Sequence, residues 1–456
     1  MKICHGLNHI EIYTVPVGDY FGQMTDAFHL VYAPHSNKAL IAGKEELEAM
    51  ERYACGAIDH HSVSGSIIEA VEELKDNDCF KAYQSIPYTI NNLTKLSILP
   101  TYNCNFSCSY CYSSKGRSTK NLDIKKAFAA IDFFIDKNRL DERRIYMAIL
   151  GGGEPFITWD SVAACIEYAS QRAIQQGFQL SIGVTTNGSI IRPEIIEILK
   201  RYHVITSISF EILERIQNKQ RRNYNEVCRV IDSLCNAGIE LSIKSIITPD
   251  NVMLLEEMTE ELATNFPQIK SLKLQPVESN TIFTDVKSLE NFYTLFSENF
   301  FKAREKAIKH GIELYCPVSK NTDYLLDHYC GGELCLTPDG SISICHRISS
   351  PLEPDYNNFI YGMIDGQHKI HFNTAQFNEL IAHNSSKPDR CKNCFAKWHC
   401  GGGCLAQAKT YTPDMLKVIC DWTVLFIRQI ILLRLEDQYK AQGLPGLKAT
   451  IDNDLC

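Results

Sequence analysis

The 456-residue sequence contains no uninterrupted hydrophobic run long enough to cross a membrane. Its opening stretch, MKICHGLNHIEIYTVPVGDY, lacks the apolar core of a secretory signal. The most apolar late stretch, residues 423–435, is interrupted by Arg428, Gln429 and Arg434, and it is shorter than the roughly 20 apolar residues that a spanning helix needs. We therefore expect a cytoplasmic protein without a membrane partner, in which residues 423–435 form a packed helix.

The sequence also lacks an excess of basic charge. It has 46 Lys and Arg against 54 Asp and Glu, which gives a net charge of −8. Lys and Arg form no stripe along the chain, and this argues against nucleic acid as a partner. The isolated pairs Arg143–Arg144 and Arg221–Arg222 are expected to lie on the solvated surface.

Cysteine is the residue present in excess, with 19 copies. A disulfide framework is typical of small secreted chains, and this chain is neither small nor evidently secreted. Clustered cysteines in a reducing compartment indicate metal ligation instead. The spacing of the cysteines therefore decides what they bind.

The chain divides into regions that differ in composition and in secondary-structure pattern. Residues 1–94 predict a small α+β domain, winged-helix-like, with two short strands around the His-Ser-Asn turn within 28–43. Residues 95–310 alternate strand and helix patterns and predict an incomplete (β/α)6 barrel, whose chemistry belongs at the C-terminal ends of the strands. Residues 311–425 are rich in cysteine and loops, and the folded state of such a segment usually depends on bound metal for its stability. Residues 426–456 are expected to form a C-terminal helix and a tail.

The barrel prediction depends on six strand patterns and the helical patterns between them. The strand patterns lie at 95–100, 144–151, 180–188, 205–210, 240–247 and 271–277. The clearest helical patterns lie at 123–137, 161–177 and 225–238.

The first cysteine group, TYNCNFSCSYCYSS, directly follows the first of these strands. Cys104, Cys108 and Cys111 can hold three irons of a [4Fe–4S] cube and leave the fourth iron open, as in a site built to bind substrate. The alternative is a zinc knuckle, but zinc commonly takes four ligands and no fourth Cys or His follows closely. This C-x3-C-x2-C spacing, with Tyr110 and Tyr112 beside the last cysteine, resembles the defining motif of the radical S-adenosylmethionine (SAM) superfamily.

That resemblance implies which residues bind SAM. The open iron would chelate the amino and carboxylate groups of SAM, and Cys104, Cys108 and Cys111 would form the catalytic centre. The stretch GGGEPF at 151–156 is similar to the family motif that holds the SAM amino group. Where the family often has Asp-Gly after the fourth strand, this chain has Glu211-Ile212. The residues expected to contact SAM are Tyr110, Gly152, Gly153, Glu154, Thr186, Asn187, Ser209 and Lys244.

The second cysteine group resembles the SPASM extension, which carries two auxiliary iron–sulfur clusters behind a radical SAM domain. All seven positions of that extension have a matching cysteine in this chain. The resemblance implies three [4Fe–4S] clusters in total, with Cys330, Cys345 and Cys404 on the inner auxiliary cluster. The outer auxiliary cluster would be held by Cys391, Cys394, Cys400 and Cys420.

Several points stay open at this stage. The fourth inner ligand is Cys335 or Cys316, or the position is open to substrate. A treble-clef-like zinc site is the alternative for the whole group. His346 is expected to be a surface or packing residue, with a hydrogen bond to a cluster as the alternative.

Radical SAM enzymes with a SPASM extension usually modify peptides or proteins. We expect an oxidoreductase that abstracts hydrogen from a ribosomally made precursor peptide and forms a thioether or C–C cross-link, or a related modification. The N-terminal region would recognise the leader of the peptide by strand pairing, and flavodoxin or ferredoxin would donate the electron.

Two other functions are considered. Anaerobic sulfatase maturases, which form formylglycine, carry Asp where this chain has His346. A non-catalytic, metal-stabilised binding protein would leave the GGGEPF stretch and the three-cysteine motif unexplained.

Overall fold

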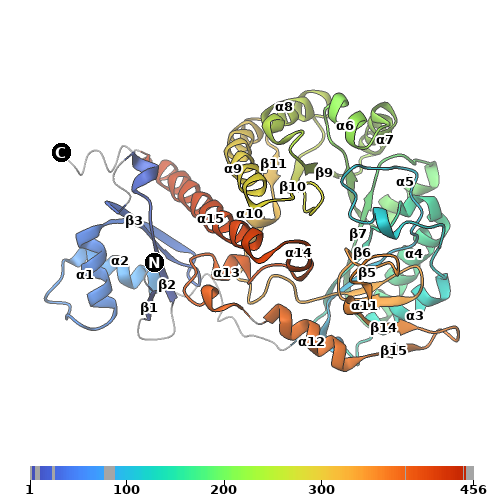
Figure 1. Cartoon of the computed structure of the whole chain (residues 1–456), viewed down its shortest axis with the longest axis horizontal. Coiled ribbons are helices and arrows are strands. Elements are labelled where there is room, and N and C mark those ends of the chain that lie inside the picture. Colours follow the sequence, from blue (N-terminus) through green and yellow to red (C-terminus); the bar gives the residue numbers. More distant parts are fainter. Residues whose placement is uncertain are drawn as a thin grey trace.

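The computed structural model describes residues 3–5, 11–22, 26–75, 88–385, 387–444, 446 and 447. From residue 448 onwards, the expected C-terminal tail lies outside the described residues. Two bodies lie at opposite ends of the molecule, with the longest helix between them (Figure 1).

The N-terminal body is a four-stranded antiparallel sheet with two helices on it (Figure 1). The expected pair of strands around the His-Ser-Asn turn is present as β3 and β4, which pair along their whole length. The strands, in spatial order, are β1 (Ile3–His5), β2 (Glu11–Pro16), β3 (Phe28–Ala33) and β4 (Lys38–Gly43). The helices are α1 (Lys44–Ala54) and α2 (Gly65–Lys75).

The second body contains all six strands that the sequence predicts for the barrel, and they lie parallel and in chain order. These strands are β5 (Lys95–Ile98), β6 (Arg144–Ile149), β7 (Gln179–Thr186), β8 (Ile205–Ser209), β9 (Leu241–Ile247) and β10 (Ser271–Pro276). They form a curved sheet that is covered on its outer side by helices (Figure 1). Those helices are α3 (Ile124–Phe134), α4 (Trp159–Gln176), α5 (Pro193–Arg201), α6 (Glu214–Gln220), α7 (Tyr224–Asn236), α8 (Leu255–Asn265) and α9 (Val286–Lys309).

The sheet continues beyond the six predicted strands on both edges. At one edge β11 (Glu313–Tyr315) pairs parallel to β10. At the other edge β12 (Leu334–Leu336) pairs parallel to β5 and begins an antiparallel meander from the cysteine-rich region. The meander continues with β13 (Ser341–Ser343), β14 (Ile360–Ile364) and β15 (Ile370–Phe372). The cysteine-rich region is therefore part of the barrel sheet.

The remaining helices of the described residues belong to this cysteine-rich region. They are α10 (Pro317–Asn321), α11 (Tyr356–Phe359), α12 (Thr374–Ser385), α13 (Lys397–Cys400), α14 (Leu405–Thr410) and α15 (Pro413–Ala441). The expected boundary between residues 425 and 426 falls inside α15, which is one continuous helix. Among the residues that can be described, none of the helices is long and apolar enough to cross a membrane.

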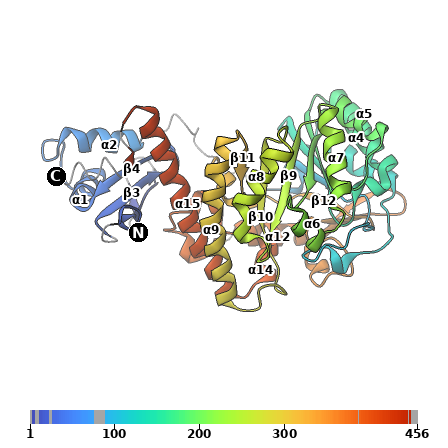
Figure 2. The ribbon, with the colours of Figure 1, turned by 90° about the horizontal axis from the view of Figure 1, so that it is seen from above.

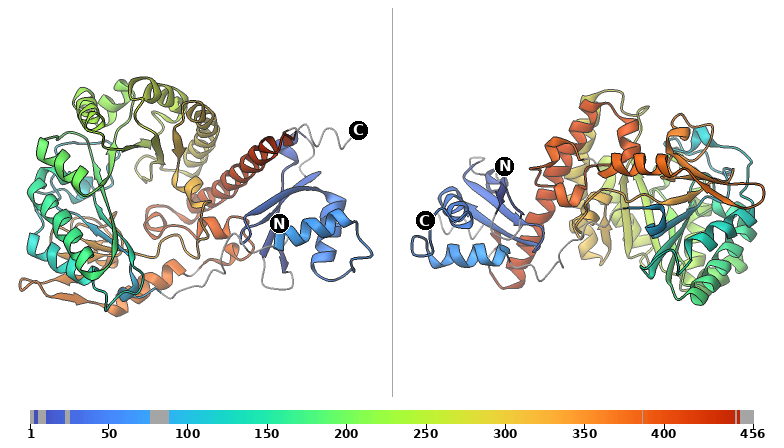
Figure 3. Two further views of the ribbon diagram at one scale, coloured as in Figure 1. Left: turned by 180° about the vertical axis from the view of Figure 1, so that it is seen from behind. Right: turned by 90° about the horizontal axis from the view of Figure 1, so that it is seen from below.

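Helix α15 packs against both bodies (Figure 2). Ile419, Phe426 and Ile430 belong to the large core that includes the barrel. Ile427 and Ile431 pack instead with residues of β2 and β3. Because it is apolar on more than one face, the helix is buried between two partners. Views from behind and below show the same placement (Figure 3).

The N-terminal body also contacts the segment between Cys394 and Cys400. The Glu11 carboxylate accepts hydrogen bonds from Lys397 Nζ at 2.7 Å and from Trp398 Nε1 at 2.6 Å. Tyr13 donates a third hydrogen bond to the same carboxylate. Burial by itself would raise the pKa of Glu11, but these hydrogen bonds outweigh it and hold the pKa below its ordinary value.

We predict that Glu11→Gln lowers the free energy of opening of the N-terminal body by about 2 kcal/mol at pH 7, because hydrogen bonds to a charged acceptor are lost. Hydrogen exchange of the β2 and β3 amides measures this quantity. Since the folded-state pKa of Glu11 is lowered, the difference between wild type and variant is full above the ordinary value of 4.5. It should shrink as the pH falls through the lower, folded-state pKa.

The matched control is Glu73→Gln, at the exposed pair with Lys38. An exposed ion pair contributes little, so this variant should change the free energy of opening by under about 0.5 kcal/mol. Equal effects of the two variants, or a Glu11 effect that grows at low pH, would contradict this account of the interface.

Candidate active site and metal centres

The first cysteine group lies on the loop that leaves β5, at the C-terminal ends of the barrel strands. The thiols of Cys111 and Cys104 both act on the pKa of Cys108, so the three lie within electrostatic range of one another. Burial is the largest cause that raises the Cys108 pKa, and nearby Arg221 lowers it. Arg117 donates a hydrogen bond to Cys111 Sγ at 3.2 Å. Metal ligation requires thiolates, and the two guanidinium groups favour that form.

The glycine-rich stretch docks directly onto this loop. Glu154 N donates to Asn103 O at 2.8 Å. A Cβ atom on Gly153 would lie 1.9 Å from the same Asn103 oxygen, so only glycine fits at this position. Gly151 and Gly152 have φ angles of 53° and 72°, in the left-handed region that favours glycine. The sequence therefore brings the GGGEPF stretch and the cysteine loop into contact, as the family resemblance requires.

The Glu154 side chain is only 2% exposed and is already hydrogen-bonded by the protein. Its carboxylate accepts from Thr186 Oγ1 at 2.6 Å, from Asn187 N at 2.7 Å and from Phe156 N at 3.1 Å. Burial raises its pKa. A carboxylate has about four acceptor sites, so one more donor, such as an ammonium, can still be accepted. Asn187 also donates to Asn105 Oδ1 at 2.9 Å, which links the end of β7 to the cysteine loop.

A buried polar network beneath the cysteine loop contains residues that the sequence analysis did not select. Glu211 is fully buried and accepts hydrogen bonds from Tyr110, Ser245 and the backbone N of Ile246. Arg221 donates to Tyr110 Oη at 2.8 Å and lies 4.0 Å from Glu211. The expectation that Arg221 lies on the surface is wrong, because it is 6% exposed. Its neighbour Arg222 is exposed, as expected.

The two remaining residues expected to contact SAM lie side by side. Ser209 on β8 is in register with Lys244 on β9, and Lys244 is in register with Lys273 on β10. Burial lowers the pKa of Lys244 to about 7, and the positive charges of Lys273, Arg221 and Arg347 act in the same direction. A site with this surplus of positive charge favours a carboxylate.

The second cysteine group separates into two sets of thiols. Burial, with the thiols of Cys420, Cys394 and Cys391 acting in the same direction, raises the pKa of Cys400 to about 12. The four residues expected at the outer cluster therefore lie together. Burial likewise raises the pKa of Cys345, with Cys404 and Cys330 among the contributing charges. The three residues expected at the inner cluster thus lie close enough to interact.

The two cysteines considered as a fourth inner ligand lie in different places. Cys335 is fully buried on β12, and after burial itself the largest effects that raise its pKa come from Glu333 and Cys345. Cys316 is also buried, and burial raises its pKa to about 11 against the opposing effects of Ser319, Val318 and Lys273. The structure therefore places Cys335 beside the inner set, whereas the main electrostatic neighbours of Cys316 are residues of β10 and α10.

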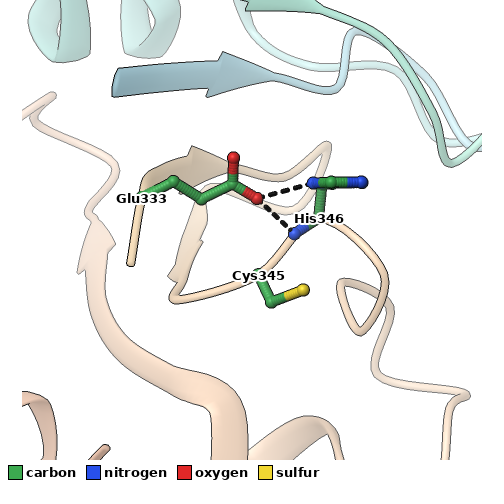
Figure 4. Close-up of side chains that lie close together, drawn as sticks. All are labelled: Glu333, Cys345 and His346. Carbon is green, nitrogen blue, oxygen red and sulfur yellow. Dashed lines mark hydrogen bonds and ion pairs between the residues drawn. The ribbon is translucent and has the colours of Figure 1, made fainter. Parts of the chain in front are cut away.

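Glu333 and His346 form a hydrogen-bonded pair next to Cys345 (Figure 4). Glu333 Oε1 lies 2.7 Å from both the backbone N and the ring Nδ1 of His346. Lys95 and Ser97 bind the other carboxylate oxygen. Burial would raise the pKa of Glu333, but His346 and Lys95 outweigh burial and hold the pKa well below its ordinary value. His346 is therefore not an isolated surface or packing residue. No sequence motif pointed to Glu333.

A cavity of about 240 Å³ lies between the end of β10 and the second cysteine group. Its lining includes Glu278, Cys316, Cys400, Cys404 and Cys420. Grouped thiols that open onto shared space, with basic side chains nearby, have the donor chemistry that iron–sulfur clusters require. The residues present therefore fit the clusters that the sequence resemblance implies.

Comparison with known proteins identifies similar sequences. Residues 98–262 match the model of the Radical SAM superfamily. The radical SAM cyclopropyl synthase TigE of Paramaledivibacter caminithermalis is 21% identical over 372 residues, 75% of each chain. The serine-type anaerobic sulfatase-maturating enzyme of Klebsiella aerogenes is 21% identical over 327 residues, which cover 67% of this chain and 77% of the relative.

Solved structures share the fold at low sequence identity. The structure of native anSMEcpe with bound AdoMet superposes with a TM-score of 0.60 and 16% identity, over 74% of this chain and 98% of that chain. Streptococcus suis SuiB bound to S-adenosylmethionine gives a TM-score of 0.50 and 13% identity, over 85% of this chain and 94% of that chain.

The adjacent arginines of the buried network offer a matched pair of variants. We predict that Arg221→Met lowers the free energy of unfolding by about 3 kcal/mol, because it leaves Glu211 buried without its positive partner. Arg222→Met changes an exposed side chain, so its effect should stay within about 0.5 kcal/mol. Urea unfolding of the two variants measures the difference, and equal stabilities would show that the network does not depend on Arg221.

Proposed function

The chain belongs to the radical SAM superfamily, and on that premise we propose that it is a maturase acting on a ribosomally made precursor peptide. The family implies SAM and one [4Fe–4S] cluster. Two auxiliary [4Fe–4S] clusters are part of the proposal. The observation that carries it is the contact between the three-cysteine loop and the GGGEPF turn, next to a second group of seven interacting thiols.

The roles proposed for individual residues follow from their positions. Cys104, Cys108 and Cys111 would hold the catalytic cluster, with Arg117 hydrogen-bonded to Cys111 and Arg221 lowering the pKa of Cys108. Glu154 would accept the SAM ammonium, while Lys244 would bind its carboxylate. When bound, the reduced cluster and SAM supply a 5′-deoxyadenosyl radical that abstracts hydrogen from a substrate carbon. The chain itself orients SAM and substrate and excludes water from the barrel.

Three features support a peptide maturase. The fold likeness to SuiB covers 85% of this chain, whereas the likeness to anSMEcpe covers 74%. SuiB has also been solved bound to the precursor peptide SuiA. The N-terminal body is a four-stranded sheet whose outer strands could pair with a leader peptide. His346 stands where sulfatase maturases are expected to carry Asp.

The alternative function is sulfatase maturation, which the Klebsiella aerogenes relative performs by its name. A test with two peptides separates the functions. Conversion of a sulfatase-derived peptide to formylglycine, with a co-expressed precursor peptide left unchanged, would favour that alternative. An altered mass of the precursor alone would support the maturase. In either case a one-electron donor such as flavodoxin or ferredoxin is required.

We predict that Cys104→Ala abolishes reductive cleavage of SAM in the anaerobically reconstituted protein, because a cluster ligand is lost. Cys394→Ala should retain part of the SAM cleavage but form less modified peptide, because only the outer cluster is changed. Cys55→Ala is the control, since Cys55 is exposed and outside both cysteine groups. Release of 5′-deoxyadenosine and peptide mass are measured together.

The outcomes have separate meanings. Full product yield from Cys394→Ala would remove the outer cluster from the reaction. Failure of the wild-type protein to cleave SAM under reducing conditions would favour a non-catalytic, metal-stabilised binding protein.

A further inference from the structure

We propose that His346 Nε2 is the fourth protein ligand of the inner auxiliary cluster, in addition to Cys330, Cys345 and Cys404. This assignment rests on the proposed function, which supplies that cluster. Cys345 Sγ, a carboxylate oxygen of Glu333 and one ring nitrogen of His346 lie within 4.8 Å of one another. His346 directly follows Cys345 and shares its turn (Figure 4).

The imidazole is held in the way that metal-ligating histidines are held. A ligating histidine usually donates its second ring N–H to a carboxylate, which fixes the tautomer and the ring orientation. Here Nδ1 lies 2.7 Å from Glu333 Oε1, and the His346 backbone N donates to the same oxygen. These two contacts leave Nε2 as the ring atom available to a metal. Among the described residues, no hydrogen bond or ion pair involves Nε2.

The carboxylate that orients His346 is itself fixed. Glu333 is 2% exposed, and Lys95 and Ser97 contact its second oxygen at 2.5 Å and 2.6 Å. Lys95 and Ser97 belong to β5, the first strand of the barrel. Among the described residues that contact the Glu333 carboxylate, His346 alone has a ring nitrogen that remains free to bind a metal.

The competing cysteines fit less well. The Cys335 thiol lies beside Cys345, but its residue is fully buried in a strand paired with β5 and β13. The main electrostatic partners of Cys316 are Ser319, Val318 and Lys273, none of them a proposed inner-cluster thiol.

A neutral imidazole in place of a thiolate leaves the cluster with one negative charge fewer. Replacement of thiolate by histidine raises the reduction potential of iron–sulfur clusters. The inner auxiliary cluster would then accept an electron more readily than the outer one, whose four expected ligands are all thiols.

Pulsed EPR of the reduced auxiliary clusters tests the assignment. Replacing Cys104, Cys108 and Cys111 by Ala removes the catalytic cluster and leaves about eight auxiliary irons per chain. In this background, protein labelled with 15N-histidine should show a strong nitrogen coupling that changes with the isotope. His346→Ala should lose that coupling. His371→Ala, at an exposed histidine of β15, and Cys335→Ala should both retain it.

A second variant keeps the test independent of cluster loss. His346→Cys should keep about eight auxiliary irons, lose the nitrogen coupling and lower the potential of one cluster. About eight irons without any histidine-sensitive coupling, or a coupling that survives His346→Ala, would overturn the ligand assignment alone. No auxiliary iron in this background would overturn the two-cluster proposal and the assignment with it.

Discussion

Buried thiolates need positive charge nearby, and this requirement accounts for much of the arrangement around the cysteines. Arg117 contacts Cys111, and Arg221 lowers the pKa of Cys108. In the second group, Lys95 acts in the same direction on Cys330 and Arg347 on Cys404. Arg390 does so for both Cys391 and Cys394. Burial raises the pKa values of Cys108, Cys330, Cys391, Cys394 and Cys404, and the cations oppose that effect where ligation requires deprotonation.

The same constraint connects distant parts of the fold. Lys95 lies on the first barrel strand, yet it holds Glu333 beside the inner cysteines. Arg221 joins Tyr110 on the cysteine loop to Glu211 after β8. The N-terminal body binds the segment between Cys394 and Cys400 through Glu11, and Tyr32 Oη lies 2.8 Å from His399 Nε2. The segment between Cys394 and Cys400 is therefore tied to the proposed leader-binding body, and the first cysteine group and the inner cysteines are tied to the barrel.

The sequence was sufficient where the relevant information is local. All six barrel strands follow from short apolar patterns that alternate with helical ones, and the cysteine loop and GGGEPF turn are contiguous motifs. It was insufficient where partners meet only after folding. An Arg-Arg pair looks like solvated surface, and only the packing of α6 against the cysteine loop buries Arg221. Glu333 belongs to no motif. The start of α15 could have been found, since Thr412 caps it and Pro413 occupies its first turn.

The central claim is that both cysteine groups hold iron–sulfur clusters. Iron, acid-labile sulfide and zinc per chain, measured after anaerobic reconstitution of the full-length protein, test it most directly. Three [4Fe–4S] clusters predict about twelve irons, an equal amount of sulfide and no stoichiometric zinc. About four irons with one or more zinc ions would contradict the claim, and the second cysteine group would then be a structural zinc site.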